Sequence, residues 1–301
     1  MRPQSFNKPE LLKLCGRTHT VADIYAAVDL IHQAGVVNFS LDLISGLPHQ
    51  TLDHWQASVE AAIALAPKHL SSYDLIVEPV TAFGRQYQPG DQPLPSDTAA
   101  AEMYRLAQKL LTTAGYEHYE VSNYAQSGFQ CRHNRVYWKN QPFYGFGMGA
   151  ASYLQGQRFT RSRKTREYYD WVTTQKSLLP TRITAQPPDS TLRERLQPTL
   201  LTPHSSPDLL LDTLMLGFRL AEGLSLVELA QQFGKPILDK ICQVLDPYYE
   251  QGWVEVVGVE WQAIAQFSTE ALPPTARMKL SDPEGFLFSN QVLADLFAEL
   301  E

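Results

Sequence analysis

Residues Asn38–Thr51 (NFSLDLISGLPHQT) describe one strand, one turn and the start of one helix, and they decide the fold. Apolar residues run through Val36–Ile44 with few interruptions, which is typical of a mostly buried strand. A Gly-Leu-Pro step breaks this strand, and Thr51 is well suited to cap the helix that follows. In a parallel α/β fold the carboxyl end of such a strand faces the binding site, so we expect Asp42 to look into a pocket.

The alternation of helices and strands continues on both sides of this segment. Helices are expected at Val21–Ala34, after Thr51, and through Ala114 with Ser96 or Asp97 as the cap, and strands at His69–Val77 and Tyr116–Ser122. Strands separated by long helices predict a parallel sheet with right-handed crossovers. Only about three strands can be recognised, whereas closing a parallel barrel requires roughly six to eight. The predicted fold class is therefore α/β, the C-terminal part of an open, incomplete barrel, and we expect residue 1 to fall inside a domain.

The C-terminal third predicts a different module. Prolines, serines and threonines accumulate over 179–207, which is typical of a linker or insertion. Beyond it the sequence predicts helices at Leu209–Ala221, Leu224–Phe233 and Ile237–Gln251, a hairpin over Trp253–Ala265 and a closing helix, Gly285–Leu300. Three helices and a hairpin suggest a winged-helix-like α+β module. The predicted organisation is a partial barrel domain over 1–178, a linker over 179–207 and a C-terminal domain over 208–301.

Charge and composition narrow the possible partners. The formal net charge is −7, and residues 208–301 hold 5 Lys and Arg residues against 15 Asp and Glu residues. Nucleic acid is a poor partner for such an acidic part, so we expect it to pack against the first domain instead. No apolar run approaches the ~20 residues of a membrane-spanning helix. Three widely separated cysteines do not suggest a disulfide framework, which favours a cytoplasmic location.

Several sequence blocks follow one another in a characteristic order. They are PQSFN at 3–7, DLISGLPHQT at 42–51, LSSYDLIVEP at 70–79, GYEHYEVSNYA at 115–125, RHNRVYW at 132–138, GFGMGAASY at 145–153, LMLGFRLAEG at 214–223 and GFLFSNQVL at 285–293. With these blocks the chain resembles the oxygen-independent coproporphyrinogen III oxidase-like radical-SAM family, and within it the haem chaperone branch. The resemblance runs almost end to end and implies a radical-SAM barrel, S-adenosylmethionine (SAM) and a [4Fe–4S] cluster.

By this resemblance the SAM site would contain Gln4, Arg17 and Asp42, with Ile76 and Tyr153 at lining positions. The residue types suit SAM, because a carboxylate can hold ribose hydroxyls and a guanidinium can clamp the amino-acid carboxylate. Two simpler interpretations stand beside this one. Asp42 could cap the Gly-Leu-Pro turn at the end of its strand, and Arg17 could be a solvated surface residue.

The segment at 133–138 resembles the HNxxYW motif of the haem chaperone branch. It makes His133, Asn134, Tyr137 and Trp138 candidate haem-binding residues, with His133 as a candidate iron ligand. A neutral imidazole can bind haem iron, and aromatic rings can stack on a porphyrin. The alternative is a loop histidine bonded to backbone, with both aromatic residues anchored in the core. The sequence does not separate these two interpretations.

Three neighbouring features carry weaker hypotheses. Cys131 could be an iron ligand, although a lone cysteine is more often an inert small hydrophobe. The glycines of GFGMG at 145–149 would let backbone approach a ligand closely or simply form a turn, and Ala151 stands where the family often has a histidine. Arg158, Arg161, Arg163, Lys164 and Arg166 could meet porphyrin propionates or the acidic module, or form a solvated charged face.

The cysteines limit what this chain can do by itself. A radical-SAM cluster requires three closely spaced thiolates, whereas Cys15, Cys131 and Cys242 are far apart in the sequence. We therefore expect no self-contained radical chemistry from this chain. The favoured function is a haem chaperone-like protein that binds haem and SAM and passes haem to an acceptor protein. The alternatives are an oxygen-independent coproporphyrinogen III oxidase and a non-catalytic scaffold.

Overall fold

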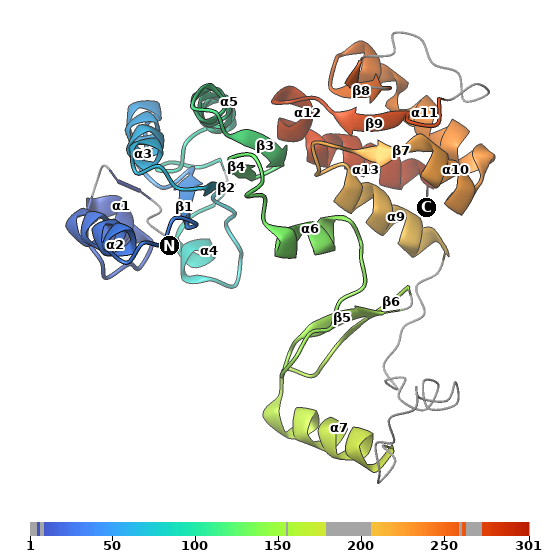
Figure 1. The fold of residues 1–301 in the computed structure, drawn as a ribbon, viewed down its shortest axis with the longest axis horizontal. Coiled ribbons are helices and arrows are strands. Elements are labelled where there is room, and N and C mark those ends of the chain that lie inside the picture. Colours follow the sequence, from blue (N-terminus) through green and yellow to red (C-terminus); the bar gives the residue numbers. More distant parts are fainter. Residues whose placement is uncertain are drawn as a thin grey trace. The chain divides into compact units, whose positions relative to one another are not determined.

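The computed structural model describes residues 5–6, 9–88, 90–154, 156–178, 206–258, 261–262 and 273–300. The chain divides into two compact units, one made of residues 1–132 and 218–299 and the other of residues 133–217 and 300–301 (Figure 1). Gln4 and residues 179–205 of the predicted linker lie outside the described residues. The predicted domain boundaries at 178 and 207 stay a prediction.

The first unit begins with the predicted succession of helices and strands. Its elements are α1 (Pro9–Leu14), α2 (Val21–Gln33), β1 (Ser40–Ser45), α3 (Leu52–Ala64), β2 (His69–Asp74), α4 (Ala82–Gln86), α5 (Asp97–Thr113), β3 (Glu117–Glu120) and β4 (Asn123–Ala125). The long helices start where the sequence predicts, because Thr20, Thr51 and Ser96 accept backbone N–H groups of the first turns of α2, α3 and α5.

These strands form an open four-stranded sheet in the order β1-β2-β4-β3. The pair β1–β2 is parallel, with Asp42 opposite Ser71, whereas β4 runs antiparallel to both β2 and β3. The prediction of an all-parallel sheet is therefore wrong at this edge. Only Val121 and Ser122 separate β3 from β4, and so short a connection can join only antiparallel strands. The prediction of an open, incomplete barrel is confirmed for the part of the chain that the structure describes.

One face of this sheet holds the hydrophobic core. Leu41, Leu70 and Tyr124 are buried there against side chains of α3 and α5, including Trp55 and Met103. The indole Nε1–H of Trp55 donates to the Met103 carbonyl oxygen at 2.8 Å, so the largest buried ring also has its polar atom satisfied. This packing fixes the strands and leaves the opposite face of the sheet for polar residues.

The C-terminal part of the first unit is a small α+β module. It contains β7 (Leu224–Ser225), α10 (Leu226–Phe233), α11 (Lys235–Glu250), β8 (Val254–Val257), β9 (Arg277–Leu280), α12 (Glu284–Leu287) and α13 (Ser289–Leu300). The strands form an antiparallel sheet in the order β7-β9-β8. The strand β8 pairs with β9, which comes much later in the chain, and most of the second arm of the predicted hairpin over Trp253–Ala265 lies outside the described residues. The predicted closing helix is interrupted at Phe288.

Within this unit the acidic module packs against the barrel part, as expected. The Val121 N–H donates to the Arg219 carbonyl at 2.9 Å, and the Ala221 N–H donates to the Tyr119 carbonyl at 3.0 Å. Residues 219–221 thereby extend the sheet beyond β3. Two side-chain pairs add to this edge: Arg105 donates to both carboxylate oxygens of Glu284 at 2.6 and 2.8 Å, and His118 contacts Asp282 at 2.9 Å.

The second unit contains α6 (Arg132–Trp138), whose first residue falls in the first unit, the antiparallel hairpin of β5 (Ala151–Leu154) and β6 (Gln157–Thr160), α7 (Thr165–Leu178) and α9 (Ser206–Gly217). Most of the residues that the structure does not describe lie between α7 and α9 in the sequence. Among the described helices of both units, none is long and apolar enough to cross a membrane.

Candidate functional site

A row of polar side chains crosses the sheet of the first unit on the face opposite the core. The register places Asp42 beside Ser71, Ser71 beside Asn123, and Asn123 beside Glu120. These residues lie on β1, β2, β4 and β3 in turn, so the row runs the full width of the sheet. A β-bulge between His118 and Glu120 lets Tyr119 join the same face, where its hydroxyl lies 2.8 Å from His69 Nε2.

Much of this polar face is buried and incompletely hydrogen-bonded. Asn123 donates to the Glu120 carboxylate, yet the Asn123 Oδ1 atom and the His69 Nδ1 atom are buried without a hydrogen-bond partner. Burial raises the pKa of the Glu120 carboxyl and lowers the pKa of the His69 imidazole, although the nearby Asp42 carboxylate opposes the second shift. Buried atoms without partners are uncommon in native proteins and are found preferentially at functional sites.

A hollow of about 310 Å³ lies at the carboxyl ends of β1 and β2. Gly46 and Asp74, which directly follow and end these strands, line it together with Ile76 and residues at the start of α5. The Ser45 hydroxyl donates to the Asp74 carboxylate, and burial raises the pKa of Asp74. Carboxyl ends of parallel strands are the usual ligand-binding edge of an α/β sheet.

The predicted SAM residues are only partly brought together. Asp42 lies in the middle of β1 on the polar face, whereas Ile76 lines the hollow just described, and Asp42 is not among the residues that line that hollow. Arg17 follows α1 in the same unit, and its N–H donates to the Leu12 carbonyl at 2.9 Å. Gln4 lies outside the described residues, and Tyr153 belongs to the second unit.

The haem candidates lie on α6 of the second unit and start a chain of aromatic contacts. The exposed His133 ring packs edge-on against Tyr137 with a centroid separation of 5.0 Å, and the Tyr137 hydroxyl lies 3.1 Å from His133 Nε2. Tyr137 then packs edge-on against Phe143 at 4.6 Å. Phe143 in turn lies 6.5 Å from the ring of Tyr153, and their backbones exchange two hydrogen bonds.

This chain of rings argues against one of the two sequence interpretations of the motif, and the haem-binding interpretation stays a prediction. His133 is exposed and bonds to the Tyr137 side chain, so a backbone-bonded loop histidine does not describe it. Asn134 and Trp138 are half-buried on the same short helix. Phe143 was not singled out by the sequence. A single phenylalanine in a loop belongs to no recognisable sequence motif. Its backbone hydrogen bonds with Tyr153 place its ring against the ring of Tyr137.

The basic run at 158–166 separates into residues with different surroundings. Arg158 lies over the Tyr153 ring at 5.5 Å and donates to Asp212 on α9 at 3.1 Å. Arg161 donates to the Gly145 carbonyl and to Ser152, which fixes the glycine-rich loop to the hairpin. Lys164 pairs with Glu167 at 2.9 Å, while Arg163 and Arg166 are exposed.

The weaker glycine and cysteine hypotheses become more specific. A Cβ at Gly145 would meet the Ala151 carbonyl oxygen at 1.9 Å, so this glycine is required by the approach of two backbone segments. Ser152 is fully buried there, and its hydroxyl accepts the Gly145 N–H at 2.9 Å. The Cys131 N–H donates to the Tyr119 hydroxyl at 3.3 Å in the first unit. The glycine-rich segment is thus a structural turn in the described part of the chain.

A [4Fe–4S] cluster does not fit the residues of this chain. No group of three or more His, Cys, Asp or Glu side chains among the described residues could hold a metal ion. Burial raises the pKa of the Cys15 thiol, and burial with Asp239 and Asp246 nearby raises the pKa of Cys242 to about 12. Cluster ligands are thiolates, so these environments favour the wrong protonation state.

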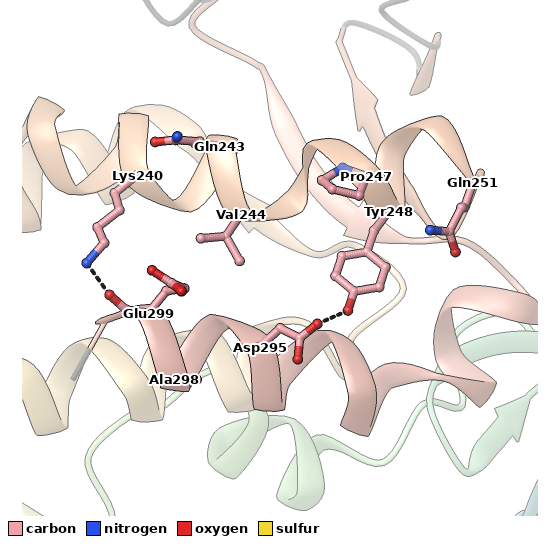
Figure 2. A pocket seen from close by; sticks show the side chains of 9 residues that line it. All are labelled: Lys240, Gln243, Val244, Pro247, Tyr248, Gln251, Asp295, Ala298 and Glu299. Carbon is pink, nitrogen blue, oxygen red and sulfur yellow. Dashed lines mark hydrogen bonds between the residues drawn. The ribbon is translucent and has the colours of Figure 1, made fainter.

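A second hollow, of about 550 Å³, lies between α11 and α13 (Figure 2). Two hydrogen bonds cross it: Lys240 donates to the Glu299 carbonyl, and the Tyr248 hydroxyl donates to the Asp295 carboxylate. Its walls mix charged, amide and apolar side chains without an unpartnered buried polar atom among those described. The two hydrogen bonds connect α11 to α13, and none of the residues predicted from the sequence lines this hollow.

Comparisons with known proteins place this geometry in a family. Residues 205–263 match the HemN C-terminal domain. The heme chaperone HemW of Synechocystis sp. is 41% identical over 296 residues, covering 97% of this chain and 66% of that protein. The heme chaperone HemW of Bacillus subtilis is 32% identical over 245 residues, covering 81% and 60%. The structure of coproporphyrinogen III oxidase (HemN) from Escherichia coli, a radical SAM enzyme, matches with a TM-score of 0.68 at 17% identity, over 98% of this chain and 63% of that one.

The open sheet, its covering helices and the C-terminal module therefore define a radical-SAM-type fold that is incomplete in this chain. The chain belongs to the coproporphyrinogen III oxidase-like radical-SAM family, in the haem chaperone (HemW) branch. It spans at most about two thirds of the length of these relatives.

Proposed function

We propose that this chain binds haem through its second unit, as part of a haem chaperone-type protein. The observation that carries the proposal is the exposed imidazole of His133, held edge-on against Tyr137 at the start of a continuous chain of aromatic rings. Haem is a flat, largely apolar macrocycle whose iron binds imidazole nitrogen, so this pairing offers both kinds of contact. The relatives named heme chaperone make haem the first ligand to test.

His133 presents two ring nitrogens with different surroundings. Nε2 lies 3.1 Å from the Tyr137 hydroxyl, which orients the imidazole, while the side chain as a whole is exposed. An exposed ring can reach the iron of a planar ligand without rearrangement of the protein core. The ring of Tyr137 can then support one edge of the macrocycle, and Asn134 and Trp138 lie on the same short helix.

We also propose that the first unit holds SAM at the carboxyl ends of β1 and β2. The hollow of about 310 Å³ at the carboxyl ends of these strands, lined by Ile76, supports this site, and Asp42 is assigned to it by the family resemblance alone. SAM is the source of an adenosyl radical where a reducing cluster accompanies it. In this chain Asp42 would position the ribose hydroxyls, and the side chains of Leu75 and Ile76 would cover an apolar edge of the ligand. Arg17, Gln4 and Tyr153 remain predicted members of this site.

The wider role follows from these two ligands. The protein would act in the cytoplasm, take up haem and deliver it to an acceptor protein. Turnover of coproporphyrinogen III by this chain is not expected, because its three cysteines cannot supply the cluster.

The experiment is a spectrophotometric titration of ferric haem into the 301-residue chain and into His133→Ala. We expect a Soret shift with saturable binding for the unchanged chain, and a loss of about tenfold or more in affinity for His133→Ala, which is about 1.4 kcal/mol. His32→Ala is the matched control, because His32 is also exposed on a helix and also lies edge-on to an aromatic ring, that of Phe39.

Two results would contradict the haem proposal. One is the absence of any saturable Soret change with the unchanged chain. The other is an equal loss of affinity in His133→Ala and His32→Ala, which would mean that haem adsorbs to exposed histidines in general. For the SAM site, calorimetric titration of SAM into Asp42→Asn should show weaker binding than titration into the control Asp29→Asn, whose carboxylate is exposed on α2.

A further inference from the structure

Arg158 stands at the far end of the aromatic chain that begins at His133. On β6 its guanidinium lies over the ring of Tyr153, with 5.5 Å between Cζ and the ring centroid. Tyr153 is almost completely buried and is therefore a fixed platform. The guanidinium also donates to the Asp212 carboxylate at 3.1 Å, and 37% of the Arg158 side chain remains exposed to solvent. Arg158 is thus a positioned cation that a dissolved anion can reach.

The second unit has the charge that an anionic ligand would need. Residues 133–217 hold 11 Lys and Arg residues against 6 Asp and Glu residues, in a chain whose net charge is −7. This stretch of sequence is therefore net basic, in contrast to the chain as a whole. Haem carries two propionate carboxylates, and guanidinium groups bind carboxylates with matched, bidentate geometry.

The other described cations of the hairpin region are less suited to this task. Arg161 is committed to the Gly145 carbonyl and Ser152, and it also lies over the Trp171 ring at 5.0 Å. Lys164 already pairs with Glu167 on its own helix. Arg158 differs because its carboxylate partner, Asp212, lies on another element, α9.

We propose that Arg158 binds a propionate of haem and exchanges Asp212 for that carboxylate when haem occupies the surface beside His133 and Tyr137. The inference rests on the proposed haem binding and names the anion-binding residue of that same site. The exposed rings of His133 and Tyr137 then form the aromatic part of the haem surface, with His133 as the iron ligand and Arg158, held on the buried ring of Tyr153, as the propionate ligand. Asp212 acts as a built-in competitor that holds Arg158 in place in the haem-free state.

The exchange makes the two members of one ion pair behave in opposite ways. Arg158→Gln removes the cation, so haem binding should weaken. Asp212→Asn keeps the shape of the side chain but removes the competing charge, so haem binding should strengthen. A purely structural ion pair would behave differently, because either substitution would disturb the same contact between β6 and α9 and would lower affinity.

The test is an equilibrium titration of each variant with two probes, ferric haem and metal-free protoporphyrin IX. Arg158→Gln should lose about three- to tenfold in affinity for both probes, because both carry the propionates. Asp212→Asn should gain about two- to fivefold for both. His133→Ala should lose affinity for haem alone, because only haem carries iron. Lys176→Gln, which removes an exposed charge from the last turn of α7, is the control and should change affinity less than twofold.

Each outcome has a distinct meaning. Saturable haem binding that is unchanged in Arg158→Gln, reduced in both Arg158→Gln and Asp212→Asn, or reduced equally in Lys176→Gln overturns the role of Arg158 and leaves the haem proposal standing. Failure of the unchanged chain to bind haem overturns both proposals together. Opposite shifts in the two ion-pair variants support the exchange.

Discussion

Glu120 is a fully buried carboxyl on β3, at one end of the polar row that crosses the sheet. Asn123 and the Ser122 N–H donate to it, and Arg219 lies near enough to lower its pKa, yet desolvation is larger and the pKa is raised. The folded protein therefore holds its proton at pH values where the unfolded chain has already lost it. The burial of such a group has a stability cost that depends on pH.

Replacing Glu120 with glutamine should reveal this cost. The folded pKa lies above the ordinary value of 4.5, so the stability of the unchanged protein falls as pH rises from 4.5 through the folded pKa. Glu120→Gln cannot titrate, so its free energy of unfolding relative to the unchanged protein should rise over that same window. Urea unfolding at a series of pH values measures the difference. A difference that stays constant with pH would mean that Glu120 is ionised in the folded state.

Individual residues could be predicted where a motif fixes their chemistry. Asp42 and His133 were singled out from short blocks, and the structure places Asp42 on a polar face and His133 in an aromatic contact. Their ligand roles stay predictions. Asn123, Phe143 and Asp212 were not identified, because each depends on a partner distant in sequence. Only the register of β4, the backbone pairing of Phe143 and the docking of α9 bring those partners close.

Elements with strong local signals were predicted well. The helices α2, α3 and α5 have a hydrophobic period, which predicted their positions, and Thr51 was also identified as a cap, whereas Thr20 was not. The strand β4 was missed as a separate element because Asn123–Ala125 is too short to show alternation. The pairing of β8 with β9 was not predicted, since pairing between distant strands leaves no local pattern.

The edge strand at 219–221 gives a prediction for one element. The Ala221 N–H donates to the Tyr119 carbonyl at 3.0 Å, so Ala221→Pro removes one of the two hydrogen bonds that attach this segment to β3. We expect the free energy of unfolding to fall by about 1–3 kcal/mol and the Val121 amide to exchange faster with deuterium. Ala221→Ser keeps the N–H and is the control. Equal stability of the two variants would show that these two backbone hydrogen bonds do not hold the segment against β3.

The largest unpredicted feature of the first unit is how firmly its two parts are joined. His118 is almost completely buried, stacks on Tyr124 at 4.0 Å and packs edge-on against Phe286 of the C-terminal module. Its Nδ1 atom has Asp282 as partner at 2.9 Å. The packing of the acidic module on the barrel part could be inferred from charge alone, but the particular contacts could not.

Removing the partner of His118 should weaken this joint. Asp282→Ala leaves a buried imidazole nitrogen without a hydrogen bond, so we expect a loss of about 1–3 kcal/mol in the free energy of unfolding. Asp246→Ala removes an exposed carboxylate from α11 and should have little effect. Urea unfolding of both variants measures the difference. Equal effects would mean that Asp282 contributes only as a surface charge.

At the scale of the whole molecule, the ordered blocks identified the family and the strand count indicated an open barrel. Both inferences succeed because they draw on many residues together, so that missing β4 as a separate strand does not change them. The predicted domain boundaries at 178 and 207 flank a segment that the structure mostly does not describe, so they stay a prediction.

A titration of ferric haem into the 301-residue chain is the decisive test of a haem site on the second unit. We expect a saturable Soret shift at one haem per chain, which His133→Ala weakens and His32→Ala does not. A featureless, non-saturating absorbance change, or binding that is indifferent to His133, would contradict it.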